Sequence, residues 1–179
     1  MCEPLVMDCI FCRIAEGSAE SFRVFESDAC VAFLDTSPVA RGHTLVIPRA
    51  HSSSVLRMGS EESAALFQTV QLVADAIVNA LHADGFNLGA NTGKCAGQTV
   101  NHAHIHVIPR FFGDQFWCTR HPQTMPNGLN GIDTNELAQI SEQIRIQLGS
   151  HRSPSRDAAS EQQGLLTTGS SSSIRLARL

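Results

Sequence analysis

The chain has 179 residues, of which 42% are hydrophobic and 17% are charged, and its formal net charge is -4. A chain of this length and apolar content can bury one sizeable core without disulfide support, so we expect one compact domain. The residues after Gly149 include four arginines but only one aspartate and one glutamate, which leaves the preceding body more acidic than the whole chain. An acidic body argues against a nucleic acid polymer as the main partner.

Two further features of composition bear on cellular location. No basic region followed by an apolar run opens the chain, and no uninterrupted apolar stretch is long enough to cross a bilayer. We therefore expect no membrane partner and a cytoplasmic location. The six cysteines are unevenly spaced and no signal peptide accompanies them, which favours reduced thiols, with at most one metal-binding pair, over a disulfide framework.

The first fifty residues predict a short helix and three strands. CIFCRIAEG is typical of a short helix that ends at Gly17. FRVFES and ACVAFLDT alternate well enough to form two strands around Ser27 and Asp28, and HTLVIPR predicts a third strand.

The longest predicted helix begins at Ser60, which we place as an N-cap ahead of two glutamates. Its apolar residues recur at helical spacing as far as Asp84 and Gly85, where the helix ends. These apolar residues are Phe67, Val70, Ala74, Ile77, Val78 and Leu81.

The second half of the chain predicts a hairpin and a final helix. FNLGANTG is a strand that runs into a glycine-rich loop, and HAHIHVIP is the strand that returns from it. Asp133 and Glu136 form a capping pair for a helix that ends at Gly149. Its apolar residues are Leu137, Ile140, Ile144 and Leu148. Residues 150–179 are predicted to be a disordered tail rich in Ser, Gln and Gly, so the predicted domain comprises residues 1–149.

The segment NHAHIHVIPR, residues 101–110, carries three histidines at alternate positions. In a strand, His102, His104 and His106 would project from one face, roughly 7 Å apart in successive steps. A lone histidine is usually a solvated or a core residue, but three in strict alternation behind a glycine-rich loop indicate a functional row.

Spacing alone leaves two chemical uses of this row open. Histidines two apart on a strand can chelate one zinc ion and leave a position for water. Alternatively, the upstream segment NTGKCAGQT can aim N–H groups at a phosphate, toward which a neutral imidazole is a competent nucleophile. A P-loop does not fit, because only three residues separate Gly89 from Gly93 and Cys95 stands where Ser or Thr should hold magnesium.

HAHIHVI resembles the signature of the histidine triad (HIT) family, and GHTLVIPRAH and AGQT resemble the segments that accompany it, from about residue 8 to residue 112. The resemblance implies an α+β fold with an antiparallel sheet of about five strands, one long helix and a C-terminal helix, usually as a homodimer. It also implies hydrolysis or transfer at the α-phosphate of a purine nucleotide, such as an AMP-amine. No cofactor is needed for that chemistry.

The resemblance assigns catalytic roles to the three histidines. His104 would be the nucleophile that forms a nucleotidyl-histidine intermediate, His102 would help to orient it, and His106 would hydrogen-bond a non-bridging or leaving-group oxygen. A backbone carbonyl on the far nitrogen of His104 would leave the attacking nitrogen unprotonated. His106, if protonated, would stabilise charge on the phosphate oxygens.

The same resemblance implies nucleotide-binding residues outside the row. Asp35 matches a carboxylate that accepts hydrogen bonds from both ribose hydroxyls, and His43 matches a residue that supports the triad. The residues that match the walls of the base slot, for which core packing is the alternative, are Ile10, Phe11, Ile14, Phe33 and Leu45. The residues that match phosphate or leaving-group contacts are Asn91, Gly97, Gln98 and Thr99.

One branch of the family binds structural zinc through a C-x-x-C pair, a histidine after the IPR strand and the first triad histidine. The matching positions here are Cys9, Cys12, His51 and His102. Two sulfurs and two nitrogens suit a closed tetrahedral zinc site. With zinc there, His102 would be a structural residue.

The sequence leaves other functions and another location open. A dinucleoside polyphosphate hydrolase is the second hypothesis, a nucleotide-binding or signalling module with incidental catalysis is the third, and a hydrolase that uses the triad as metal ligands is the fourth. The C-terminal Ala177-Arg178-Leu179 resembles the small-basic-leucine tripeptide of peroxisomal import. A peroxisome-like organelle, including the glycosome, is therefore the alternative to the cytoplasm.

Overall fold

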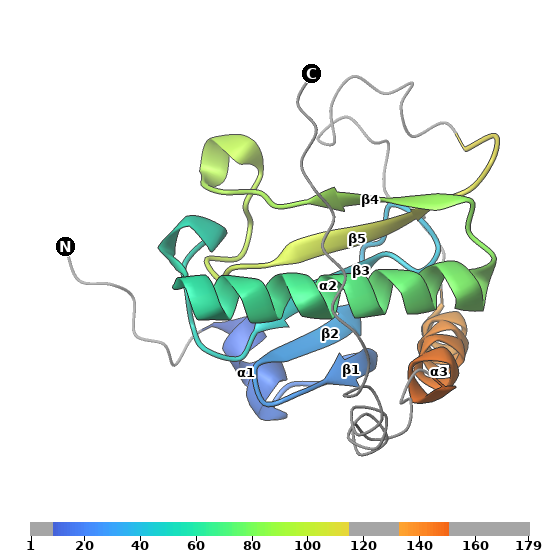
Figure 1. The fold of residues 1–179 in the computed structure, drawn as a ribbon, viewed down its shortest axis with the longest axis horizontal. Helices are drawn as coiled ribbons and strands as arrows, with labels where there is room; N and C mark the ends of the chain where they lie inside the picture. The colour runs from blue at the N-terminus through green and yellow to red at the C-terminus, as the bar shows by residue number, and fades with distance from the viewer. Residues whose placement is uncertain (1–8, 115–132, 151–179) are drawn as a thin grey trace, which may run out of the picture.

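The computed structural model describes residues 9–114 and 133–150 of the chain (Figure 1). The predicted tail beyond Ser150 lies outside the described residues, together with the tripeptide Ala177-Arg178-Leu179. Import through that tripeptide therefore stays a prediction, as does the boundary of the domain.

The described residues form a five-stranded sheet in which every neighbouring pair is antiparallel, in the order β1-β2-β3-β5-β4. The strands are β1 (Arg23–Glu26), β2 (Cys30–Leu34), β3 (Thr44–Pro48), β4 (Gly85–Gly89) and β5 (Ile105–Arg110). The predicted α+β architecture and the predicted pairing of the last two strands are both confirmed.

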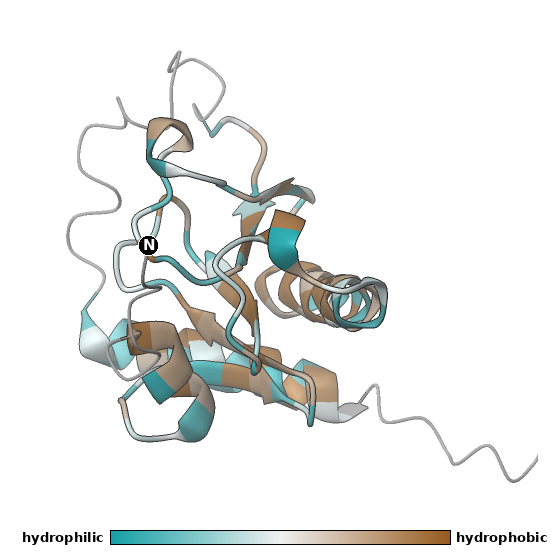
Figure 2. Cartoon of the chain, turned by 90° about the vertical axis from the view of Figure 1, so that its left-hand side faces the viewer, coloured by the Kyte–Doolittle hydropathy of each residue, from teal (hydrophilic) through white to brown (hydrophobic). Residues whose placement is uncertain are grey.

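Both faces of the central strands are covered, because β2 and β3 are buried at every position. Successive side chains of a strand point to opposite faces, so the two cores use alternate residues. On one face, residues such as Ala32 and Val46 join the core formed with α2 (Ser60–Leu81) and α3 (Thr134–Ser150). On the other face, Phe33 and Leu45 pack with α1 (Ile10–Glu16). Figure 2 views α2 nearly along its axis, with the sheet to one side of it.

The long helix α2 covers one face of the sheet (Figure 1). It begins at Ser60 itself, with Gly59 as the N-cap and no side-chain capping bond, so the predicted capping role of Ser60 is wrong by one residue. The helix ends at Leu81 because His82 takes a left-handed conformation with φ 53°, before the predicted stop. Phe67, the first of the apolar residues at helical spacing, is 55% exposed, whereas the neighbouring Leu66 is buried.

By length and composition alone, α2 could cross a membrane, since it has 22 residues and a mean hydropathy of 1.4. Its buried residues, including Leu66, Val70 and Ile77, belong to the core that is shared with the sheet. Packing within a globular domain therefore accounts for its apolar character.

The short helix α1 agrees with the prediction, and Gly17 ends it in a left-handed conformation with φ 88° that glycine adopts without steric cost. Two arginine side chains hold its last turn, because Arg23 donates to the carbonyl oxygen of Ile14 and Arg49 donates to that of Ala15. A helix of seven residues is not stable alone, so these contacts and the apolar cluster beneath it set its position.

The strand that carries the histidines is shorter than predicted, because the sheet ladder begins only at Ile105. Before Ile105, the main-chain N–H groups donate to carbonyls outside the neighbouring strands. The N–H of His102 donates to the carbonyl of Val100 at 2.9 Å, and that of Ala103 donates to the carbonyl of Ser52 at 2.6 Å. His102 and His104 therefore lie in an irregular segment, and only His106 is in the strand.

The C-terminal helix α3 begins as predicted, since the Asp133 carboxylate accepts from the N–H of Glu136 at 2.7 Å. It continues one residue past Gly149, where the prediction ended it. Ile140 and Ile144 are fully buried in the α2 face of the core.

Replacing Ile140 with Ala should lower the free energy of unfolding by about 2 to 5 kcal/mol, because it removes a fully buried side chain from between α3 and α2. Ile146→Ala is the matched control on the same helix, and since this side chain is 61% exposed its effect should stay within about 0.5 kcal/mol. Urea unfolding of both variants measures the difference. Equal effects would mean that α3 is not part of the cooperative core.

Candidate active site

The candidate site lies on the α1 face of the sheet, along a row of paired residues that crosses four strands. Phe33 pairs with Leu45, Leu45 pairs with His106, and His106 pairs with Gly89. Residues paired across an antiparallel sheet point to the same face. The strand register thus sets His106 beside two of the residues predicted to line a base slot.

The other triad histidines extend this row along the chain. The ring centroids of His104 and His106 are 4.9 Å apart. The ring of Phe11, on α1, lies edge-on to the rings of His104 and His102, with centroid distances of 5.4 Å and 5.9 Å. The predicted row of three imidazoles is present, although strand geometry holds only one of them.

One hydrogen bond defines the protonation pattern of His104. Its Nδ1 lies 2.8 Å from the carbonyl oxygen of His102, and a carbonyl can only accept, so Nδ1 carries the hydrogen. The neutral ring therefore keeps the lone pair on Nε2. The side chain is buried, with 5% of its surface exposed. This arrangement leaves a nitrogen of His104 available as a nucleophile.

A second chain of bonds fixes His106. The N–H of Val39 donates to His43 Nδ1 at 3.3 Å, so the hydrogen of His43 is on Nε2. His43 Nε2 lies 2.9 Å from His106 Nδ1 and donates to it. His106 consequently carries its own hydrogen on Nε2, which makes this atom a donor.

The charge of these two rings follows from burial. The pKa of His106 is lowered to about 4, mainly by burial and also by the neighbouring His43 and His104, against a smaller opposing effect of Asp35. Burial also lowers the pKa of His43, with Asp35 again opposing. Both rings are therefore neutral at pH 7 in the free protein, and His106 offers a neutral N–H donor.

The predicted walls of the base slot mostly form one buried cluster. Phe11, Ile14, Phe33 and Leu45 pack together between α1 and the sheet. Ile10 is 42% exposed at the start of α1 and lies outside this cluster. Their contact with a base stays a prediction, since core packing accounts for the four buried side chains equally well.

The loop between β4 and β5 is held by the side chain of Gln98. Its Oε1 accepts from the N–H of Gly93 at 2.8 Å, and its Nε2 donates to the carbonyls of Ser53 at 2.8 Å and Val100 at 2.9 Å. Gln98 therefore positions the loop in this structure. In the same loop Asn91 and Gly97 are half-buried and Thr99 is exposed, and the phosphate contacts of all four residues stay predictions.

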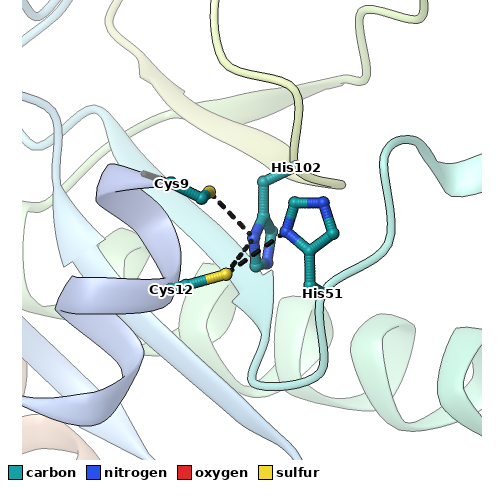
Figure 3. A group of neighbouring side chains, drawn as sticks. All are labelled: Cys9, Cys12, His51 and His102. Atoms are coloured by element: carbon teal, nitrogen blue, oxygen red, sulfur yellow. Dashed lines mark hydrogen bonds between the residues drawn. The ribbon is translucent and has the colours of Figure 1, made fainter. Parts of the chain in front are cut away.

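The four predicted metal ligands converge at one end of the row (Figure 3). His102 Nδ1 lies 3.5 Å from the sulfurs of Cys9 and Cys12, and His51 Nδ1 lies 3.2 Å from Cys12 Sγ. A tetrahedral zinc ion with ordinary bond lengths separates sulfur and nitrogen ligands by about 3.5 Å. The distances between these donor atoms therefore fit a tetrahedral ion.

The tautomer of His102 fits the same role. Its Nε2 lies 3.0 Å from the carbonyl oxygen of Pro48, so Nε2 carries the hydrogen and Nδ1 offers its lone pair to the cluster. Burial lowers the pKa of His102, and the neighbouring His51 and His104 lower it further, while the bond to Pro48 opposes this. The ring is fully buried.

A metal site made of the triad itself does not match the geometry. Among the described residues, the groups of donor atoms that converge are the Cys9 cluster above and a group of Asp35, His43 and His106. In the second group His43 uses Nε2 toward His106 and presents Nδ1 to Asp35, 3.5 Å away. Neither group contains all three triad histidines, so among the described residues the triad itself does not form a ligand set.

Sequence reasoning expected a main-chain carbonyl on the far nitrogen of His104, and the structure identifies it as the carbonyl of His102. Sequence reasoning missed the carbonyl of Pro48 and the N–H of Val39, which fix the tautomers of His102 and His43. A main-chain group has no signal in the sequence, since every residue type carries a carbonyl oxygen. It also missed the Phe11 contact with His104, because it weighed Phe11 only as part of an apolar wall.

The described residues thus form an antiparallel α+β domain with an oriented imidazole, His104, beside a second imidazole that presents an N–H donor, His106. The HIT domain family model matches residues 16–113, more than half of the chain. The chain belongs to the HIT family.

Several relatives support this assignment. The chain is 40% identical over 112 residues to adenylylsulfatase HINT3 of Arabidopsis thaliana, an alignment that covers 63% of this chain and 57% of that protein. It is 39% identical to the protein hit of Bacillus subtilis, over 75% of this chain and 95% of that one. A zinc-bound histidine triad family protein from Mycobacterium smegmatis superimposes with a TM-score of 0.67 at 36% identity, over 80% of this chain and 95% of that one.

Acid should destabilise the protein partly through His106. Its pKa is about 4 in the folded state against an ordinary 6.5, so the unfolded chain binds more protons between these values. The stability contributed by neutral His106 is complete above pH 6.5 and is lost as the pH falls toward 4. His106→Asn removes this proton uptake, and the difference in unfolding free energy between wild type and variant should change by about 2 kcal/mol over that range.

Urea unfolding of both proteins at several pH values measures this difference. Titration of groups that do not interact with His106 occurs in both proteins and cancels, whereas His43 is bonded to His106 and contributes to the difference. Parallel pH profiles would show that His106 is not held neutral by burial.

Proposed function

We propose that the protein is a hydrolase that acts at the α-phosphate of purine nucleotides, with AMP-amines as the preferred substrates, through a nucleotidyl-histidine intermediate on His104. The observation that carries the proposal is the 2.8 Å bond from His104 Nδ1 to the carbonyl of His102. It leaves an unprotonated Nε2 on a buried ring beside the N–H donor of His106. A neutral imidazole in this state is a competent nucleophile.

The reaction would proceed in two balanced steps. In the first, the Nε2 lone pair of His104 bonds to phosphorus while the bond from phosphorus to the amine breaks, and the amine leaves with the electron pair and takes up a proton from solvent. In the second, water attacks phosphorus and releases a proton to solvent, the bond to His104 breaks with its electron pair returning to Nε2, and the nucleotide monophosphate leaves. His106 would donate its Nε2–H to an oxygen of the reacting phosphate in both steps.

Binding of the nucleoside would use groups on either side of this row. Asp35 follows β2 and its carboxylate is partly exposed, so it can accept hydrogen bonds from ribose hydroxyls. The Ser37 N–H already donates to Asp35 Oδ1 at 2.8 Å, which orients the carboxylate. The apolar cluster around Phe33 and Leu45, adjacent to His106, would form one wall of the base slot.

We also propose that Cys9, Cys12, His51 and His102 bind one structural zinc ion. The fit of their donor atoms to a tetrahedral ion supports this, as does the zinc-bound relative from M. smegmatis. The ion would join α1 to the segment that carries the triad and would take no part in the chemistry.

The leaving group distinguishes the candidate substrates, and one relative suggests a further candidate. HINT3 of A. thaliana is an adenylylsulfatase, so adenylyl sulfate belongs beside AMP-amines in a substrate panel. A dinucleoside polyphosphate is the second candidate substrate. A nucleotide-binding module with incidental catalysis is the alternative of a different class.

A homodimer is also part of the proposal. Phe67 on α2 and Phe86 and Leu88 on the edge strand β4 are apolar side chains with more than 40% of their surface exposed. Apolar side chains of this size on a surface favour association. Light scattering should give twice the chain mass for wild type and a lower mass for Phe67→Glu, and a monomeric wild type would refute the dimer.

His104→Ala should abolish turnover of every substrate in the panel, by at least about 1,000-fold in kcat, because the nucleophile is removed. AMP binding should persist within a few-fold, as measured by calorimetry. His82→Asn, a change at an exposed histidine at the end of α2, is the control and should leave both quantities unchanged. Turnover retained in His104→Ala would refute the intermediate, and full biological effect of that variant would favour the binding module.

Protein purified without added zinc should contain about one zinc ion per chain, and Cys12→Ser should contain little, because a thiolate ligand is lost. Elemental analysis by mass spectrometry measures both. Zinc-free wild-type protein with two reduced, reactive thiols at Cys9 and Cys12 would exclude the site.

A further inference from the structure

His102 takes part in two separate sets of contacts. Its ring is fully buried, with Nδ1 3.5 Å from the sulfurs of Cys9 and Cys12 and Nε2 bonded to the carbonyl of Pro48. Its own carbonyl accepts from Nδ1 of His104. The same residue thus belongs to the metal cluster through its side chain and to the nucleophile through its main chain.

The sheet does not hold this carbonyl in place. The ladder between β3 and β5 begins at Ile105, three residues after His102. The local main-chain anchors are the bonds from the His102 N–H to Val100 and from the Ala103 N–H to Ser52. Ser52 directly follows His51, so one of these anchors depends on the position of another cluster ligand. A metal ion that holds the rings of His51 and His102 would therefore restrict the main chain around His102, whose carbonyl oxygen orients His104.

A second contact runs from the cluster to the nucleophile through α1. The two cysteines flank Phe11, whose ring meets the rings of both His102 and His104 edge-on. Since α1 has only seven residues, its position depends on its anchors. Metal-bound thiolates would hold Phe11 against the ring of His104.

We propose that occupancy of the cluster by a divalent metal ion orients the nucleophile, with His102 as the positioning residue and Phe11 as a secondary contact. This rests on the proposed role of His104. With the ion bound, the His102 carbonyl keeps the hydrogen of His104 on Nδ1. With the ion removed, the 101–104 segment loosens and His104 samples the tautomer with the hydrogen on Nε2, which cannot attack phosphorus. Metal content would therefore set kcat, even though the ion lies outside the reaction.

The test compares His51→Asn, His51→Cys and His82→Asn with zinc-loaded wild type. His51 contacts the cluster and not the nucleophile, so His51→Asn removes a metal ligand and leaves the His102 carbonyl and His104 in the chain. His51→Cys restores a ligand of zinc. His82→Asn is the matched change at an exposed histidine outside the cluster.

The first readout is the imidazole nitrogen spectrum of His104, recorded by NMR and assigned with His104→Ala, which reports the tautomer without substrate. Zinc-loaded wild type, His51→Cys and His82→Asn should give the signals of a single form with the hydrogen on Nδ1, whereas His51→Asn should give shifted or averaged signals. The second readout is AMP-amine hydrolysis, where His51→Asn should lower kcat about 10- to 100-fold with KM changed less than about 3-fold. Circular dichroism checks that the variants are folded.

Unchanged His104 signals and an unchanged kcat in folded, zinc-free His51→Asn would overturn the coupling. The cluster would then have a purely structural role. If His51→Asn does not fold, rapid mixing of wild type with a chelator separates the two possibilities. Loss of activity ahead of the circular dichroism signal supports the coupling, and simultaneous loss overturns it. A catalytically competent His104→Ala would instead refute the proposed nucleophile, while leaving the metal-dependent His104 spectrum of wild type as an independent result.

Discussion

The hydrogen bond between His104 Nδ1 and the carbonyl of His102 is the interaction on which the site depends. A histidine has two nitrogens of nearly equal basicity, and only an external group can decide which of them keeps its lone pair. Here a main-chain oxygen makes that decision for His104, and a chain from the Val39 N–H through His43 makes it for His106. Two neighbouring rings are thereby given opposite roles, one as an electron-pair donor and one as a hydrogen-bond donor.

The two faces of the sheet have different roles in this arrangement. The face toward α2 and α3 buries the larger apolar core, and the opposite face carries the row from Phe33 to His106 beneath α1. Because both faces are covered, the rings of His102 and His106 lie in surroundings that lower their pKa and disfavour the charged form. Burial therefore favours a neutral ring both in the cysteine and histidine cluster and in the triad.

The elements and their type were largely predictable from residue patterns. Apolar alternation identified the strands around Phe33 and Val46, helical spacing identified α2 and α3, and Gly17 identified the end of α1. The errors lie at boundaries. The apolar spacing of α2 included Phe67, which is 55% exposed, but not the adjacent Leu66, which is buried, because spacing alone does not decide which apolar residues face the sheet. The histidine strand begins late because the N–H of His102 bonds locally to Val100 and the N–H of Ala103 bonds to Ser52, both outside the sheet ladder.

The sequence by itself determined which chemical groups are available: three imidazoles at alternate positions, a C-x-x-C pair and a histidine after the third strand. Only the tertiary structure decided which ring nitrogen of His102 and His104 carries the hydrogen, because this depends on carbonyl oxygens, which every residue possesses. The neutral form of His106 likewise depends on the burial of its ring. The tertiary structure also brought Cys9 and His102, 93 residues apart in sequence, to 3.5 Å. Spacing along a chain cannot encode such a distance, because it is set by packing of α1 against the sheet.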